Sequence, residues 1–588
     1  MRWRSLVLAT ASDPVTRRLW VSLLLAVVVA FLGATPAPAS QAPSQSPQAP
    51  ARDTALPRTG TARIRGRVLA ADTGGPVRHA IVRINSFDGR DTHAVMTDGD
   101  GKYEFRDLPA ASYSLSGSKT GFMTTQLGAK QPGDPPKLLK VGEAEVIANA
   151  DIVLPRGGVI AGRVVDEFGD PVTGARVSVL RSQTVAGSRR LVTSSGSSTN
   201  DLGQYRAFGL QPGTYFVSAQ ASQMGSDVEV ADHAGYAPTY YPGTANVGEA
   251  QAIALAAGQD ATSIDIMLAL VRTARISGIA LNWQGRPAMG GITAMLVQPG
   301  ILDGFFAASG RILPDGSFTI PNLPPGDYQL TMMLSANSGS AQATDSAPRT
   351  EYGRARVSVA GSDVTGVVIQ SSLGGTVSGQ VIFDGTSPPP QLKMIVTAGL
   401  QAVGFDSSMS LPGGAPATVR EDGTFTMTGL FGDRVLHVSG QPATWTLKAV
   451  YLNGKDIIDT PLSFDGNERI TGVQMVLTDR VTHVTATVND ESGQPAEIAY
   501  VLVFVDDPAR WNAAGSRFRN GGTARDGKPF NLDRLPPGDY VAIALKSLQG
   551  IDTQDPDFLE RMRKVGVKFS LREGETRDVT LKLVDPNK

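Results

Sequence analysis

Cysteine is absent from this chain. None occurs among its 588 residues. Its absence excludes disulfide scaffolds, thiolate zinc sites, iron–sulfur clusters and cysteine nucleophiles. It also excludes attachment of a lipid to an N-terminal cysteine of the mature protein.

The chain has no excess of charge of either sign. Lysine and arginine number 54 against 55 aspartates and glutamates, and charged residues make up only 19% of the total. DNA, RNA and anionic membranes attract proteins through a surplus of positive charge. We therefore expect no nucleic-acid partner.

Residue patterns for catalysis are also missing. The five histidines begin no H-x-x-E or H-E-x-x-H arrangement, and no G-x-S-x-G elbow or Walker loop is present. We expect no catalytic, cofactor-binding or metal-binding residues and no cofactor, and hence a protein that is not an enzyme. An enzyme would require a site assembled between domains from dispersed Asp, Glu and Tyr.

Two short motifs imitate functional sites. Residues 116–119 match S-x-x-K, but they overlap the K-T-G match at 119–121, whereas penicillin-recognising enzymes need these as separate, converging elements. Residues 98–101 read Asp-Gly-Asp-Gly, which supplies too few carboxylates for a calcium loop. A strand and a hairpin turn are the favoured interpretations, with weak Ca²⁺ binding as the alternative for the second.

The first 60 residues are predicted to be a leader and a spacer. Arginines precede an uncharged run at 19–33, and Ala37-Pro38-Ala39 follows, which is typical of a secretory signal peptide over 1–39. An uncleaved N-terminal anchor is the alternative, and Arg17-Arg18 faintly resembles a twin-arginine signal. Residues 40–60 are rich in Pro, Ala, Ser and Gln and predict a disordered spacer.

Glycine and proline are abundant, at 65 and 38 residues, and many of them punctuate a repeat. A short strand pattern with a central glycine, followed by a Gly and Pro turn, occurs five times, with Ala486 replacing glycine in the last copy. The five strand patterns cover 64–68, 160–164, 276–278, 377–381 and 484–488.

The sequence pattern recurs more closely in the second half of each repeat. A turn containing Asp and Gly leads into an aromatic residue, and a Leu-Pro-x-Gly-x-Tyr segment follows, which is decayed in the fourth copy. Such a segment can close a corner between sheets, because the Leu and Tyr side chains are buried while Pro and Gly set the bend of the main chain. These segments are residues 108–113, 210–215, 323–328, 430–435 and 535–540.

This organisation predicts an all-β protein, a tandem array of about five antiparallel β-sandwich domains of about seven strands each. One short helix is expected after Asp555-Pro556. The predicted domains cover 61–156, 157–271, 272–371, 372–479 and 480–588.

The repeated motifs resemble the carboxypeptidase regulatory-like domain, most firmly in the first two copies. The resemblance implies a transthyretin-like or carbohydrate-binding-like β-sandwich, a domain common in tandem in secreted bacterial proteins. In that family the domain accompanies peptidases, TonB-dependent receptors and glycan-active proteins but is not itself catalytic.

One aromatic cluster is a candidate for glycan contact. Aromatic residues make up only 6% of the chain, and Tyr236, Tyr240 and Tyr241 are the ones that gather in one stretch. Sugar rings stack on exposed aromatic faces, but Tyr241-Pro242-Gly243 also fits a loop packed on its sandwich.

The sequence thus predicts an exported, non-enzymatic protein that acts as a structural, spacer or interaction module at the bacterial cell envelope. Its partner would be an envelope protein or polysaccharide, in the periplasm, on the cell surface or outside the cell. Membrane contact is expected only if the leader is left uncleaved. A carbohydrate-binding protein and an accessory subunit of an envelope peptidase or transport system are the alternatives.

Overall fold

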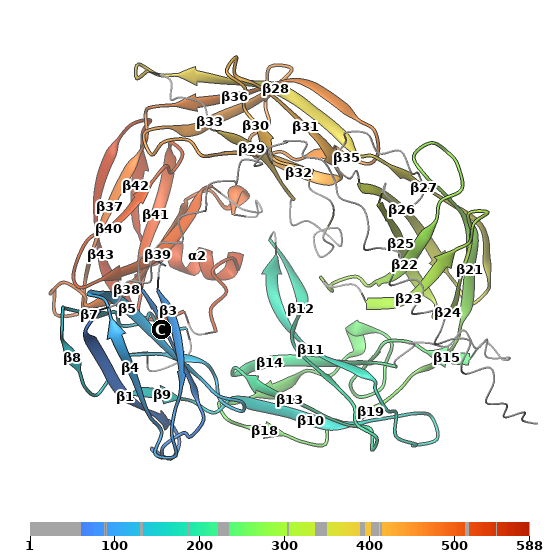
Figure 1. The fold of residues 1–588 in the computed structure, drawn as a ribbon, viewed down its shortest axis with the longest axis horizontal. Coiled ribbons are helices and arrows are strands. Elements are labelled where there is room, and N and C mark those ends of the chain that lie inside the picture. The colour runs from blue at the N-terminus through green and yellow to red at the C-terminus, as the bar shows by residue number, and fades with distance from the viewer. Residues whose placement is uncertain are drawn as a thin grey trace, which may run out of the picture. The chain divides into compact units, whose positions relative to one another are not determined.

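The computed structural model describes residues 60–586 except 87–88, 90, 130–132, 186, 222–233, 303–304, 336–349, 389–393, 401–410, 412–413, 512–516 and 549. The predicted signal peptide and all of the spacer but Gly60 lie outside the described residues. Strands account for nearly all regular structure, which confirms the all-β prediction (Figure 1). No helix of the described ranges is long and apolar enough to span a bilayer.

Five hydrophobic clusters lie in succession along the chain. Their buried side chains come from residues 62–154, 160–268, 274–369, 377–477 and 484–581. We call these segments the first to fifth units. Because each cluster draws on one segment, each unit has a core of its own. The boundaries between the units remain predictions.

The first and second units each have two main sheets. In the first unit these are β1 (Ala62–Ala70), β4 (Lys102–Leu108), β8 (Val146–Ile147) and β9 (Ile152–Leu154), and β2 (Ile81–Ser86), β3 (Thr92–Met96), β5 (Ala111–Ser118), β6 (Thr125–Gln126) and β7 (Leu139–Val141). In the second unit they are β10 (Gly158–Val165), β13 (Gln204–Leu210), β18 (Asp260–Ala261) and β19 (Ile266–Met267), and β11 (Arg176–Val185), β12 (Ser188–Ser198), β14 (Gly213–Gln220), β16 (Thr239–Tyr240) and β17 (Ile253–Leu255). A short pair, β15 (Ala234–Tyr236) and β20 (Leu270–Arg272), and the 3₁₀ turn η1 (Val247–Glu249) complete the second unit.

The third and fourth units differ in closure. The third is a closed barrel in the order β21 (Ala274–Leu281), β24 (Ser317–Leu323), β23 (Phe305–Ile312), β22 (Gly290–Val297), β25 (Gly326–Ser335), β26 (Thr350–Val359) and β27 (Val364–Ser372). The fourth has two sheets, β31 (Thr424–Leu430), β28 (Gly375–Asp384), β36 (Arg469–Thr478), β33 (Thr446–Leu452) and β34 (Lys455–Asp456), and β30 (Ala417–Thr418), β29 (Ile395–Leu400), β32 (Gly432–Ser439) and β35 (Leu462–Phe464).

The fifth unit joins its strands into one continuous sheet and carries the predicted helix. Asp555 caps α2 (Pro556–Val565) by accepting the main-chain N–H of Asp557 at 3.0 Å, which confirms the helix start. The 3₁₀ turn η3 (Pro508–Arg510) follows β38 (Ile498–Val505), the second strand of the unit in chain order. The strands are β39 (Arg519–Arg525), β38 (Ile498–Val505), β41 (Gly538–Leu545), β43 (Thr576–Val584), β37 (His483–Asn489), β40 (Phe530–Asp533) and β42 (Val567–Leu571).

Every unit contains at least one parallel strand pair, which the sequence did not predict. The first strand of each unit pairs in parallel with strands near the unit's end, as β1 does with β9 and β37 does with β43. The chain returns to its first strand through the other strands of the unit, so the crossover is long enough for a parallel pair. Alternation of apolar residues does not encode strand direction.

The repeated glycine of the first strand is explained by this parallel pair. A Cβ atom at this position would lie close to a main-chain carbonyl oxygen of the returning chain: 2.1 Å at Gly66, 2.0 Å at Gly162, 1.8 Å at Gly278 and 2.0 Å at Gly379. No side chain fits at such distances. In the fifth unit Ala486 occupies the position, and the parallel pair of β37 and β43 runs without a register shift.

The Leu-Pro-x-Gly-x-Tyr segment forms the predicted corner in four units. In each, the tyrosine is at most 1% exposed, and its hydroxyl donates to the carbonyl oxygen four residues earlier. This bond ties the end of one strand to the start of the next. The pairs are Tyr113 to Pro109 at 2.9 Å, Tyr215 to Gln211 at 2.7 Å, Tyr328 to Pro324 at 2.6 Å and Tyr540 to Pro536 at 2.6 Å.

Candidate functional site

The three tyrosines predicted to contact glycans do not form an exposed platform. Tyr240 is fully buried, packs with Leu180 and Ile301, and its hydroxyl bonds to the side chain of Gln298. Tyr236 and Tyr241 are partly buried against the core of the second unit. The ring of Tyr240 is therefore closed to a sugar, and glycan contact at the other two tyrosines remains a prediction.

The Asp-Gly-Asp-Gly segment has the bonding of a turn. The carboxylate of Asp98 accepts the main-chain N–H groups of Asp100 at 2.9 Å and Lys102 at 2.8 Å, while Asp100 pairs with the Lys102 ammonium at 3.1 Å. The described part of the chain holds no group of three or more His, Asp or Glu residues that could bind a metal ion.

A cleft between the fourth and fifth units brings together a different set of polar residues. Its volume is about 450 Å³. The fourth unit contributes residues of β32, β33 and β36, and the fifth contributes η3, the corner before β41 and the turn before β43. The charged residues that line it are Lys448, Asp459, Arg480, Arg510, Arg517, Arg534 and Glu573.

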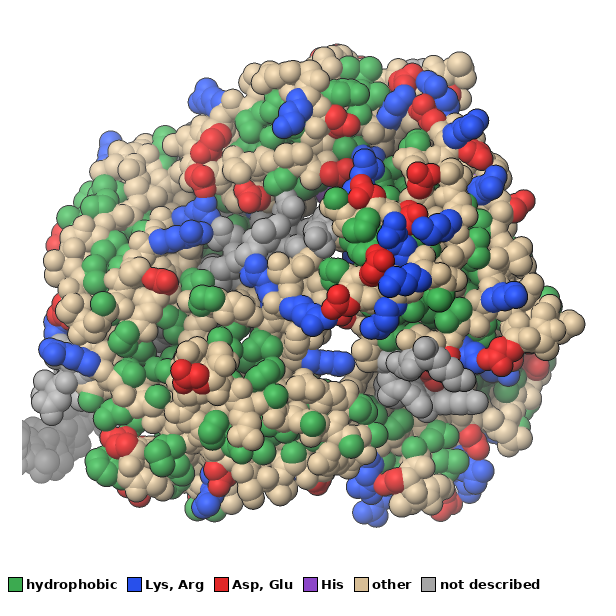
Figure 2. All heavy atoms as spheres, turned by 180° about the vertical axis from the view of Figure 1, so that it is seen from behind, with side chains coloured by type: hydrophobic (Ala, Val, Ile, Leu, Met, Phe, Trp, Pro, Cys, Tyr) green, Lys and Arg blue, Asp and Glu red, His purple; other side chains and the backbone are tan. Residues whose placement is uncertain are grey.

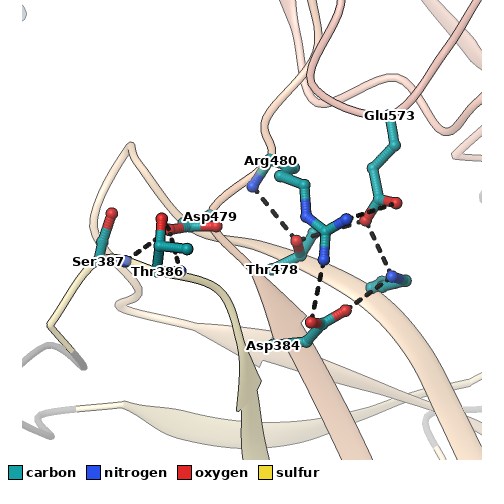
Figure 3. A network of polar contacts seen from close by, with 8 residues as sticks. Asp384, Thr386, Ser387, Thr478, Asp479, Arg480 and Glu573 are labelled. Atoms are coloured by element: carbon teal, nitrogen blue, oxygen red, sulfur yellow. Dashed lines mark hydrogen bonds and ion pairs between the residues drawn. The ribbon is translucent and has the colours of Figure 1, made fainter.

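An ion-pair network crosses one wall of the cleft. Figure 3 shows the guanidinium of Arg480 between Asp384 and Glu573, to which its nitrogens lie at 3.0 and 3.5 Å. Lys448 bridges the same two carboxylates at 2.7 and 2.9 Å. Two cations and two anions thus alternate, with Asp384 and Lys448 in the fourth unit and Glu573 in the fifth. The network links the two units.

These neighbours shift the pKa values of the network's members in the direction that keeps them charged. The hydrogen bond and charge of Lys448, aided by Arg480, lower the pKa of the Asp384 carboxyl. The hydrogen bonds from Lys448 to Asp384 and Glu573 raise the pKa of its ammonium. All four side chains remain partly exposed, so we expect the network to orient the units more than to stabilise them.

Two further arginines are held by an aromatic ring. The guanidinium carbons of Arg510 and Arg517 lie 5.0 and 4.8 Å from the ring centre of Phe518, which is 6% exposed. Arg517 also makes a bidentate pair with Asp459, through Nε at 3.1 Å and Nη2 at 3.2 Å. Arg510 pairs with Asp507 at 3.4 Å.

Arg534 is the exception among the cations of the cleft. Its Nη2 donates to the main-chain oxygen of Pro442 at 3.1 Å, and no carboxylate in the described residues lies within ion-pair distance of it. The neighbouring side chain of Gln441 also lines the cleft, and its Oε1 is buried with no donor from the described residues. The cleft is thus lined by an exposed guanidinium with no carboxylate partner among the described residues and by a glutamine whose Oε1 is unsatisfied.

Arg534 also has an unfavourable backbone conformation. It immediately precedes the corner leucine and has φ 68°. The residue before the corner leucine has positive φ in every unit, but elsewhere it is a type that tolerates this region: Asp107 at 58°, Gly209 at 75°, Asn322 at 58° and Gly429 at 76°. Arginine has a Cβ and no short side chain to bond locally, so the conformation costs about 1 kcal/mol.

The sequence prediction missed this cleft. Its lining residues lie between 435 and 573, in two units whose packing no local pattern encodes. One signal was present, because aligning the five corners places an arginine where the other copies have Asp, Gly, Asn and Gly.

Comparison with solved structures finds distant similarity to several bacterial proteins, among them two pilins. The chain is 12% identical to the Bacillus anthracis TIE protein, with 68% of each chain covered and a TM-score of 0.14. The minor pilin GBS52 of Streptococcus agalactiae is 13% identical, with 35% of this chain and 95% of that chain covered and a TM-score of 0.19. The shaft pilin SpaA of Lactobacillus rhamnosus GG is 12% identical, with 35% and 97% covered and a TM-score of 0.20. Scores this low carry no argument about function.

Comparison by sequence is informative for the first two units. No curated protein matches the chain. The sequence model of the carboxypeptidase regulatory-like domain matches residues 63–141 and 159–269. These segments lie in the first and second units, where the motifs are best preserved. The predicted resemblance is thereby confirmed, and the chain carries two successive segments of the carboxypeptidase regulatory-like type.

Proposed function

We propose that this protein is an exported, non-enzymatic structural and interaction module of the bacterial cell envelope. The observation that carries the proposal is the succession of five β-structured units, each with its own core. Such an array presents many strand edges and loops for partners, and β-augmentation at an edge needs main-chain groups rather than a catalytic constellation.

The electrostatics of the contact between the fourth and fifth units support the non-enzymatic part of the proposal. Around the cleft, Asp384, Asp459 and Glu573 are each paired with cations. A carboxylate held in this way binds a proton weakly, as the lowered pKa of Asp384 indicates, and is therefore a poor general base at neutral pH. These groups are suited to orienting two units.

The surface supports a partner that is not a polyanion. Figure 2 shows basic and acidic side chains interspersed over the face in view, in keeping with the net charge of −1. A nucleic acid or strongly anionic membrane would favour a continuous basic area.

Cell fractionation followed by crosslinking mass spectrometry tests the proposal. We expect the full-length gene product to appear in the envelope or extracellular fraction, with its N-terminus at residue 40 and crosslinks from the units to an envelope partner. A variant lacking residues 2–39 is the control and should stay in the cytoplasm. Retention of the unaltered protein in the cytoplasm would overturn export, and turnover of a peptide or glycan would overturn the non-enzymatic assignment.

A further inference from the structure

We propose that the cleft between the fourth and fifth units binds the free C-terminus of a peptide. Arg534 would contact the terminal carboxylate, and the Oε1 of Gln441 would accept the adjacent peptide N–H. The inference goes beyond the proposed function, because the chemistry of the cleft is independent of where the protein resides.

The charge on Arg534 is the first argument. The other four Lys and Arg residues of the cleft are paired with carboxylates, namely Lys448 and Arg480 with Asp384 and Glu573, Arg510 with Asp507, and Arg517 with Asp459. Arg534 donates instead to the carbonyl oxygen of Pro442 at 3.1 Å. A guanidinium has five N–H groups, so Arg534 retains donors for a bidentate carboxylate.

The backbone of Arg534 is the second argument. The fifth unit holds a long charged side chain at φ 68°, at a position where the other four units have Asp, Asn or Gly. Asparagine at this position in the third unit supports the same corner at φ 58°, so arginine is not needed to form it. Strain retained at a residue whose side chain faces a cleft points to a role for that side chain.

Gln441 supplies the complementary group. Its Oε1 is buried and lacks a donor from the described residues, and it adjoins Pro442, the residue that Arg534 contacts. A buried acceptor without a donor is costly, so a ligand N–H that reaches Oε1 when the Gln441 amide turns toward the cleft gains affinity. A carboxylate next to an N–H donor is the pattern at the end of a peptide.

The walls of the cleft favour a peptide over an acidic sugar. Leu447, Ile458, Leu535 and Pro536 supply apolar surface, and about 450 Å³ is room for the last residues of a chain. Phe518 is the only Phe, Tyr or Trp of the lining, and its ring is 6% exposed and faced by two guanidinium groups. The other ring of the lining is the imidazole of His437, so the cleft offers a sugar no open phenyl, phenol or indole face.

The test compares two pools of N-acetylated tetrapeptides on the full chain, one with free C-terminal carboxylates and one with C-terminal amides. Binding is followed by titration calorimetry and ligand-observed NMR. We expect the free-acid pool to bind and the amide pool to bind about tenfold more weakly or not at all. Equal binding of both pools, or no binding of either, would overturn the proposal.

Variants locate the site. Arg534→Asn, which should fold because asparagine occupies this position in the third unit, is expected to weaken binding about tenfold. Gln441→Leu should weaken it less, and Arg534→Lys should retain part of it because the charge remains. Arg577→Gln, outside the lining, is the matched control and should have no effect.

Two further outcomes would contradict the assignment. Unchanged affinity in both Arg534 variants would place the peptide elsewhere. If Arg534→Asn does not fold, the peptide affinities of Arg534→Lys and Gln441→Leu provide the test. Glucuronate is the competing probe. Competition by glucuronate at concentrations that match the peptides, with acetate inactive, would identify an acidic-sugar site in place of a peptide site.

Discussion

The first four units and the fifth solve the same packing problem in different ways. In the first four, a glycine at the centre of the first strand lies against a carbonyl oxygen of the returning chain. In the fifth, Ala486 fills the position, and β37 and β43 pair regularly over seven residues. The same unit replaces the Asp, Asn or Gly before the corner with Arg534. The fifth unit is thus more regular in its sheet and more strained at its corner.

This difference shows which part of the repeat is architectural and which part is free to change. The glycine is required only where the returning strand breaks its register, as between Ile276 and Gly278 and between Val377 and Gly379. Once pairing is continuous, a methyl group is accommodated. The corner tolerates even an arginine, because the tyrosine bond of Tyr540 to Pro536 holds it at 2.6 Å.

The largest expected effect comes from exchanging glycine and alanine at the centre of the first strand of a unit. Gly278→Ala places a Cβ 1.8 Å from the carbonyl oxygen of Val367, so we expect the third unit to lose about 3 kcal/mol of unfolding free energy. Ala486→Gly should cost the fifth unit only about 1 kcal/mol, through backbone entropy. Hydrogen–deuterium exchange resolved by unit measures both changes. Similar losses in the two variants would contradict the comparison.

The corner tyrosines come next. Tyr328→Phe removes the donor to the Pro324 carbonyl and leaves a buried acceptor unsatisfied, which we expect to cost about 1–2 kcal/mol in the third unit. The same exchange measurement reports it. Tyr451→Phe in the fourth unit, whose corner has Val435 in place of tyrosine, is the control and should change little.

The relative orientation of the fourth and fifth units should depend on pH. Because the folded-state pKa of Asp384 is lowered from 3.8, its contribution is complete above that value and is lost as the pH falls through the lower folded value. Lys448 acts oppositely: its folded pKa is raised above 10.5, so its contribution is lost at higher alkaline pH.

Distance distributions between two spin labels, one on each unit, measure this dependence, and the absence of native cysteine makes paired labelling straightforward. We expect a narrow distribution at neutral pH that broadens below pH 3.8. Asp384→Asn should give the broad distribution at neutral pH. A distribution that is unchanged by acid or by this variant would show that the network does not orient the units.

The smallest expected effect is a gain in stability. Arg534→Asn should raise the unfolding free energy of the fifth unit by about 1 kcal/mol, because asparagine tolerates positive φ better than arginine. The reciprocal variant Asn322→Arg should lower that of the third unit by a similar amount. Changes of the opposite sign would mean that arginine is not strained at this position.

The sequence patterns predicted those features of the fold that depend on residues close together in the chain. The corners at 108–113 and 535–540 and the helix after Asp555 rest on φ/ψ preferences and capping within a few residues. The glycine of the first strand was found as a repeat in four units, but its cause is a contact with the returning chain. The parallel pairing of the first and last strands was missed, because alternating burial is the same in either direction. The cleft was missed because Gln441 and Arg534 meet only through the packing of two units.

Affinity for free-acid tetrapeptides, measured on the unaltered chain and on Arg534→Asn, tests the central claim most directly. That claim is that the fifth unit keeps a strained arginine at its corner for binding. We predict that the variant is at least as stable as the unaltered chain and binds the pool about tenfold more weakly. A variant that is equally stable and binds with unchanged affinity would contradict the claim.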